Sequence, residues 1–265
     1  GFIYIEDNYE INKRLSTNIG LHYSLFYVNN KLYQSPQPRF SLRYLLNEFS
    51  SLKFSFATMQ QNIHLLTNSS FGLPNDMWVP ATDLVQPQYS QQAVVGYNTL
   101  FKENKYEASI EFYYKRMRNL VTFSEGINIL GTAFSSWEDR VEDDGIGSSK
   151  GIEFFIQKKK GKLTGWIGYT FSKSTRQFAN INLGNEYPYK FDRTHDLSIV
   201  SSYELKKGIN FNLTWVYGTG NAITMPTAQY FLIGENGNRP VEYFDYGQKN
   251  DFRMAPYHRL DFGCN

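Results

Sequence analysis

The chain has 265 residues, of which 17% are aromatic and 20% are charged, with a formal net charge of +2 and a mean hydropathy of −0.47. It contains no apolar run of about 18 residues or more, which excludes a transmembrane helix. The small net charge argues against nucleic acid as a partner. Cys264 is the one cysteine, so an internal disulfide and a cysteine metal cluster are excluded as well.

From the N-terminus onward, apolar and polar residues alternate with a period of two. In residues 15–28, Ile19 and Leu21 fall on one face, and Asn18 and His22 fall on the other. A strand with one apolar and one polar face fits a sheet that separates two different media. About eleven such strands are expected, over residues 2–7, 15–28, 39–46, 52–66, 91–101, 106–123, 152–157, 163–171, 195–205, 209–217 and 257–263.

The connections between these strands differ in length in a regular way. Tight turns are expected near residues 12–13, 47–48, 102–105, 158–161 and 206–208, after the odd-numbered strands. Longer loops over residues 29–37, 67–89, 124–147, 174–194 and 218–256 follow the even-numbered strands. Short turns at one end and long loops at the other are typical of outer-membrane barrels, and a soluble sandwich has no reason to sort its loops in this way.

The sequence therefore predicts an all-β fold, an antiparallel up-and-down transmembrane β-barrel with short periplasmic turns and long extracellular loops. Two local features are expected within it. The alternation loses phase near residues 116–119, which predicts a bulge. The last long loop is expected to contain a short hairpin formed by residues 230–233 and 241–246.

Six short segments, in order along the chain, have residue patterns similar to those of one protein family. They are residues 38–44, 88–98, 149–153, 169–174, 191–197 and 256–261. The fifth contains Asp192-Arg193-Thr194-His195, and the sixth contains a proline followed by Arg259-Leu260-Asp261. These segments resemble the strand starts and ends in the barrels of TonB-dependent receptors. Their aromatic, Asn- and Lys-rich composition resembles receptors from Bacteroidota.

The resemblance implies a barrel of about 22 strands with an N-terminal plug that is driven by TonB. Residues 1–265 would then form a single partial barrel domain, about half of such a barrel, with no plug domain and no TonB box. Both ends of the chain lie in strand-like sequence, which favours a piece of a longer protein.

The implied function is uptake of a scarce nutrient, such as a siderophore, a vitamin, a glycan or a peptide, across the cell outer membrane. The implied partners are outer-membrane lipid, the TonB complex reached through the plug, and a small-molecule or oligomeric nutrient. Neither enzymatic activity nor a cofactor is expected. Two alternatives are a passive outer-membrane pore or adhesin barrel, and a soluble β-rich module that binds glycans.

Aromatic residues in the long loops are the candidate ligand contacts, because aromatic rings stack on sugars and on aromatic chelators. The candidates are Trp78, Trp137, Tyr230, Phe231 and Tyr243, all expected to be exposed. Packing of the loops against one another is the alternative role for each of them.

Metal binding has little support in the sequence. Acidic residues in the loop over residues 124–147 suggest a calcium site at Glu142, Asp143 and Asp144, but their spacing is not that of an EF-hand, and a solvated acidic loop is preferred. No two of the four histidines lie within five residues of each other, so no compact histidine metal site is expected.

Overall fold

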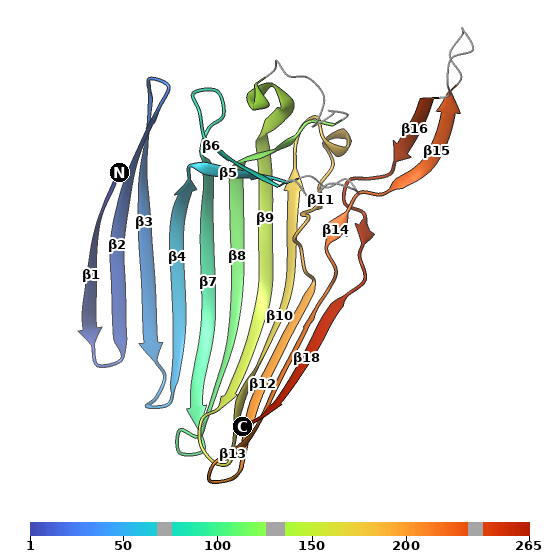
Figure 1. The fold of residues 1–265 in the computed structure, drawn as a ribbon. Helices are drawn as coiled ribbons and strands as arrows, with labels where there is room; N and C mark the ends of the chain where they lie inside the picture. Colours follow the sequence, from blue (N-terminus) through green and yellow to red (C-terminus); the bar gives the residue numbers. More distant parts are fainter. Residues whose placement is uncertain (68–75, 126–135, 233–240) are drawn as a thin grey trace.

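The computed structural model describes residues 1–67, 76–125, 136–232 and 241–265. Eleven strands form one continuous antiparallel sheet in the order in which they follow along the chain (Figure 1). They are β1 (Phe2–Asn12), β2 (Leu15–Val28), β3 (Lys31–Leu45), β4 (Ser50–Gln61), β7 (Gln88–Phe101), β8 (Tyr106–Phe123), β9 (Val141–Lys158), β10 (Leu163–Gln177), β12 (His195–Lys206), β13 (Ile209–Gly218) and β18 (Tyr257–Cys264). The predicted up-and-down antiparallel sheet is confirmed.

Shorter elements lie in the long connections at one end of the sheet (Figure 1). They are β5 (Ile63–Leu66), β6 (Met77–Pro80), the 3-10 turn η1 (Trp137–Arg140), the 3-10 turn η2 (Asn182–Gly184), β11 (Tyr187–Pro188), β14 (Ala222–Ile223), β15 (Pro226–Leu232), β16 (Val241–Tyr246) and β17 (Phe252–Arg253). Strand β5 pairs with β6, β14 with β17, and β15 with β16, while β11 adds to the upper end of β10.

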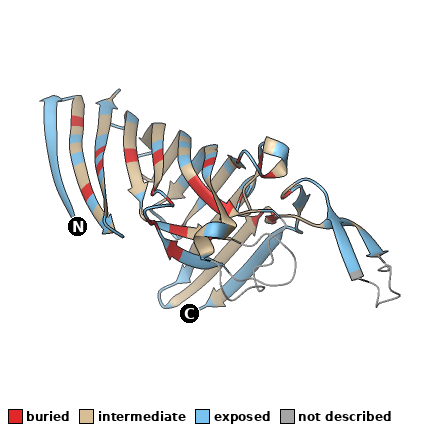
Figure 2. Ribbon diagram, turned by 90° about the horizontal axis from the view of Figure 1, so that it is seen from above, coloured by how far each residue is buried: buried red, intermediate tan, exposed pale blue. Residues whose placement is uncertain are grey.

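Seen along its strands, the sheet is an open, curved wall (Figure 2). Strands β1 and β18 form its two edges, and each has one neighbour in the described sheet. The wall has the strand order of an up-and-down barrel without closing into one.

The five tight turns lie where the sequence predicts them, at the end of the wall opposite the long connections. The β7–β8 turn is built from Lys102, Glu103 and Asn104, all with positive φ. In the β12–β13 turn, Gly208 has a φ of 86°, the left-handed conformation that a short hairpin turn requires.

The predicted loop over residues 29–37 is wrong. Strand β3 begins at Lys31, and the connection consists of Asn29 and Asn30, with φ of 44° and 62°. Asparagine tolerates this conformation, so two residues suffice for the turn. Pro36, which suggested a loop, lies in a part of β3 that pairs with β2 but not with β4. On the side without a neighbouring strand, the proline's missing N–H costs no hydrogen bond of the sheet.

Several other boundaries differ from the prediction, among them the end of β1 at Asn12 instead of residue 7 and the end of β10 at Gln177 instead of residue 171. The strand expected over residues 52–66 ends at Gln61, because Ile63–Leu66 leaves the wall as β5 and pairs with β6. The loop expected over residues 124–147 ends early, because β9 already begins at Val141. The bulge near residues 116–119 is confirmed by a register shift between Met117 and Leu120, and the hairpin in the last connection is confirmed by the pairing of β15 with β16.

The two faces of the wall differ in chemistry, as the alternation predicts. On the apolar face, Phe54, Val95 and Phe112 are register partners across neighbouring strands, and all three are exposed. Two residues of the other, polar face, Glu111 and Glu153, are partners in the same way. None of the described helices is long and apolar enough to cross a membrane.

The buried apolar side chains of the described residues lie in the long connections and at the adjoining strand ends, and most of them form two clusters. One cluster consists of Leu66, Val79, Val85 and Val121, and the other of Leu120, Phe178, Ile181 and Tyr187. The apolar face of the wall is therefore left uncovered by the described protein.

Candidate functional site

A hollow of about 400 Å³ lies on the polar face near the long connections, and we call it the rim hollow. Strands β2, β3, β4, β7 and β8 provide its lining. Three basic side chains, His22, Arg39 and Lys115, line it together with neutral residues such as Gln37 and Gln88. Its lining contains no carboxylate.

Strand register brings the two strongest bases of the rim hollow to the same level. Arg39 is the register partner of Ala57, Ala57 of Gln92, and Gln92 of Lys115. Three strand spacings separate the two backbones, roughly 14 Å, so both long side chains can reach one bound molecule between them. Ala57 extends little from the wall and leaves room there.

His22 has an unusual environment beside these bases. Its ring stacks on that of Phe2 with 5.2 Å between centroids. Its Nδ1 atom is buried and has no hydrogen-bond partner in the described structure. A buried polar atom without a partner is costly, so a bound group that hydrogen-bonds to it is stabilised.

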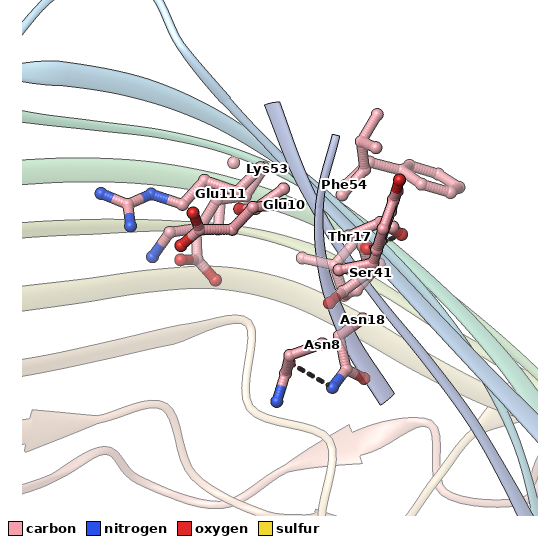
Figure 3. A pocket seen from close by; sticks show the side chains of 15 residues that line it. Asn8, Glu10, Thr17, Asn18, Ser41, Lys53, Phe54 and Glu111 are labelled. Carbon is pink, nitrogen blue, oxygen red and sulfur yellow. Dashed lines mark hydrogen bonds between the residues drawn. The ribbon is translucent and has the colours of Figure 1, made fainter. Parts of the chain in front are cut away.

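A second hollow of about 450 Å³, the mid-wall hollow, lies closer to the tight turns, and Figure 3 shows the side chains that line it. Arg43 and Lys53 are register partners there, with Glu111 two strands farther along the same row. Gly96 separates Lys53 from Glu111, and a Cβ atom at Gly96 would lie 3.1 Å from Glu111 Cγ. The glycine therefore leaves the space that the Glu111 side chain occupies.

A third hollow of about 350 Å³ extends this row and is called the aromatic hollow. Phe155 and Trp166 line it, with 6.1 Å between ring centroids. Three carboxylates, those of Glu111, Glu153 and Asp196, line it as well. The polar face thus carries basic groups near the rim and an acidic region lower down.

The structure brings together three of the five predicted aromatic candidates, since Tyr230 and Tyr243 are register partners on the β15–β16 hairpin with Phe231 next in sequence, whereas Trp78 and Trp137 lie in other connections. Trp78 is exposed on β6, whereas Tyr230, Phe231 and Tyr243 are exposed on the β15–β16 hairpin, which stands away from the wall (Figure 1). The expected exposure of Trp137 is wrong, because η1 places its half-buried side chain against the cluster that contains Leu66 and Val121.

The acidic candidates lie in strand β9 rather than in a loop. Strand alternation directs Asp143 away from Glu142 and Asp144. Glu142 accepts hydrogen bonds of 3.0 Å from Ser124 Oγ and from Asn180 Nδ2, so it joins three segments of the chain. Nowhere in the described ranges do three acidic, histidine or cysteine residues gather as metal ligands would.

Polar contacts also fix the long connections above the wall. Asp192 is buried, forms an ion pair with Arg253, and accepts a hydrogen bond from the Ser174 backbone N–H at 2.5 Å. This carboxylate thus joins the β10–β12 and β13–β18 connections. Asn250 adds a second tie, since its Nδ2 donates to the Pro188 carbonyl at 2.9 Å.

The histidine of β5 shows how tightly these connections pack. His64 has no exposed surface, and burial lowers its pKa to about 4. Its Nδ1 lies 3.0 Å from Gln88 Nε2, and its buried Nε2 has no hydrogen-bond partner in the described structure. The neutral ring thereby connects β5 to the start of β7, beside the rim hollow.

The rim hollow was not recognisable from the sequence. The alternation assigns Arg39 to the polar face of its strand, and Lys115 likewise, but their meeting depends on the register of two strands between them. The glutamines and basic residues that line the rim hollow have no regular spacing in the sequence that would indicate a binding site.

Comparisons with known proteins agree with this architecture. Residues 1–263 match the family described as TonB dependent receptor-like, beta-barrel. No curated protein sequence gives a match.

Among solved structures, the pyoverdine outer membrane receptor FpvA from Pseudomonas aeruginosa is similar, with a TM-score of 0.64, 14% identity, and coverage of 98% of this chain and 34% of the receptor. The FrpB iron transporter from Neisseria meningitidis has a TM-score of 0.61 and 12% identity over 98% of this chain and 37% of the transporter. The ferric-catecholate import receptor Fiu from E. coli has a TM-score of 0.57 and 14% identity over 100% of this chain and 44% of the receptor.

The chain spans between 34% and 44% of the length of these three proteins. At such low identity these three structures show a shared fold. The match over nearly the whole sequence is the stronger finding. The chain belongs to the TonB-dependent receptor-like β-barrel family, whose barrels lie in the outer membrane.

Proposed function

We propose that the chain forms part of the barrel wall of a TonB-dependent receptor that takes up a small-molecule nutrient. The observation that carries the proposal is the division of the wall into an uncovered apolar face and a polar face with hollows. Outer-membrane lipid is the partner of the apolar face, and the nutrient passes along the polar one. The similar barrels include a receptor bound to pyoverdine and a ferric-catecholate import receptor, which supports a siderophore ahead of a vitamin, a glycan or a peptide.

We further propose that residues 1–265 are a single partial barrel domain of a Bacteroidota-type receptor, with the plug in another part of the protein. The charges of the mid-wall row support a plug. Arg43 lies directly opposite Lys53, and Glu111 lies directly opposite Glu153. Like charges in such positions repel, and none of the four forms an ion pair with another described residue.

A plug that places acidic groups against the first pair and basic groups against the second removes both repulsions. Its docking against the wall then provides the route by which the TonB complex drives release of the nutrient. Ligand binding and gating, without bond chemistry, make up the mechanism.

Two measurements on the full-length receptor test this function. Reconstituted in vesicles, the receptor should resist sucrose-driven swelling, because a docked plug closes the barrel. The purified periplasmic domain of TonB should bind to it in a pull-down. Swelling without TonB binding would establish the passive pore instead, and a closed barrel that does not bind TonB would favour an adhesin. The soluble glycan-binding module is no longer an alternative, because it disagrees with the family of the chain.

A further inference from the structure

We propose that the rim hollow binds an anionic group of the transported ligand, with Arg39 and Lys115 as its two cationic contacts. This inference rests on the proposed function and deepens it by naming a ligand class. The class is a small, water-soluble molecule that carries carboxylate or phosphate groups.

The sign of charge distinguishes the rim hollow from the other two hollows. The mid-wall hollow combines carboxylates with Arg43 and Lys53, and the aromatic hollow is lined by carboxylates without a base. The rim hollow is lined by Arg39, Lys115 and His22 and by no acid. An anion is therefore attracted to the rim hollow and repelled from the aromatic hollow.

The two cations are available to a ligand. Across the described ranges, neither Arg39 nor Lys115 forms an ion pair or a side-chain hydrogen bond. A guanidinium group binds a carboxylate or a phosphate through two parallel hydrogen bonds, and an ammonium group adds a second, adaptable donor. Two such groups that line one hollow can hold an anion between them.

The neutral lining indicates what else the ligand carries. Gln37 Nε2 donates to Ser24 Oγ at 3.0 Å, and Gln88 Nε2 is 3.0 Å from His64 Nδ1. Each contact uses one of the two N–H donors of the amide, so the second N–H and the amide oxygen of both glutamines remain for a ligand. A ligand with hydroxyl or N–H groups beside its anionic group can hydrogen-bond to these amides.

The location of the hollow favours a soluble ligand over a lipid phosphate. Arg39 and Lys115 lie on the polar face, whereas lipid contacts the apolar face. Arg116, the next residue along β8, lies on the apolar face, since residues alternate along a strand. The volume of about 400 Å³ also falls within the range of small-molecule sites.

The test measures binding of three anionic probes to the full-length receptor in detergent by isothermal titration calorimetry. The probes are citrate, inorganic pyrophosphate and 2,3-dihydroxybenzoate, with sucrose as the neutral probe. At least one anionic probe should bind, more weakly at high than at low NaCl, and sucrose should not bind at this site. Arg39→Gln and Lys115→Gln should each weaken binding of that probe about tenfold, and the double variant about a hundredfold.

Arg116→Gln is the matched control, because it removes the same charge one residue away on the opposite face. It should leave the affinity unchanged. Equal losses in Lys115→Gln and Arg116→Gln would overturn the proposal, since they would reflect a general loss of positive charge. Binding of none of the three anionic probes would overturn it as well.

A third outcome distinguishes a plug contact from a ligand site. If acidic groups of the plug occupy the rim hollow, the double variant lowers the thermal unfolding midpoint without changing probe affinity, and the proposal fails. The vesicle and TonB assays on the same preparation report separately on the receptor function, which stands if only the anion assay fails.

Discussion

His64 couples the packing of the long connections to pH. Its folded-state pKa of about 4 lies below the model value of 6.5, so the unfolded chain binds the proton more readily than the folded one. The stabilising effect of the neutral ring is fully present above the unfolded pKa and is lost as the pH falls from 6.5 toward 4. This difference in pKa corresponds to a loss of unfolding free energy of about 3 kcal/mol once His64 is protonated in both states.

We therefore expect β5 and β6 to open locally in mildly acidic buffer while the wall strands stay protected. Hydrogen exchange of the β5 amides, corrected for intrinsic rates and followed from neutral pH to about pH 4, measures this opening. His64→Gln should remove the pH dependence, and the same substitution at the exposed His258 should retain it. A pH dependence that survives in His64→Gln would assign the effect to another group.

At the scale of the strand, the apolar face determines where a charge is tolerated. Leu213 and Thr214 are neighbours on β13 and face opposite sides of the wall. An arginine at Leu213 would enter the lipid, at a cost of about 2–4 kcal/mol near the middle of the bilayer. An arginine at Thr214 would extend over the polar face beside Asp261, its register partner, at little cost.

Urea unfolding of the full-length receptor in lipid vesicles compares Leu213→Arg with Thr214→Arg. The first should lower the unfolding free energy well below that of the second. Equal costs for the two variants would contradict the assignment of this face to lipid.

Strands and short turns were predictable because each depends on a few neighbouring residues. The period of two assigned both faces of β13, and a lysine pair with Gly208 indicated its turn. The internal structure of the long connections was not predictable, since the packing of Leu66 against Val121 brings together segments with no shared local pattern. The Asn29–Asn30 turn was missed because Pro36 suggested a loop, whereas Pro36 lies in a stretch of β3 that pairs with β2 and not with β4.

The rim hollow was not predictable either, because its lining residues come from several strands. Arg39 and Lys115 meet through β4 and β7, whose register is set by the bulge-free pairing of many residues at once. The predicted aromatic candidates lie on three different connections, and only Tyr230, Phe231 and Tyr243 share a hairpin. Polar-face cations become a site only after the strands are aligned side by side.

At the scale of the whole molecule, the wall has three surfaces that require a partner: the apolar face and the outer edges of β1 and β18. Unpaired strand edges form hydrogen bonds readily with other strands, and an exposed apolar face of this extent associates in water. The 265-residue chain, produced by itself, should therefore form large assemblies in plain buffer.

Detergent should separate these two causes of association. It covers the apolar face but leaves the edge N–H and C=O groups unpaired, so the chain should become a small β-rich oligomer rather than a monomer. Sedimentation velocity with and without detergent, together with circular dichroism, measures both steps. A single monodisperse monomer in plain buffer would contradict the lipid-facing assignment. A monomer in detergent would mean that β1 and β18 pair with each other and close the sheet. The open wall does not have this pairing. Closing it would require greater curvature between every pair of strands.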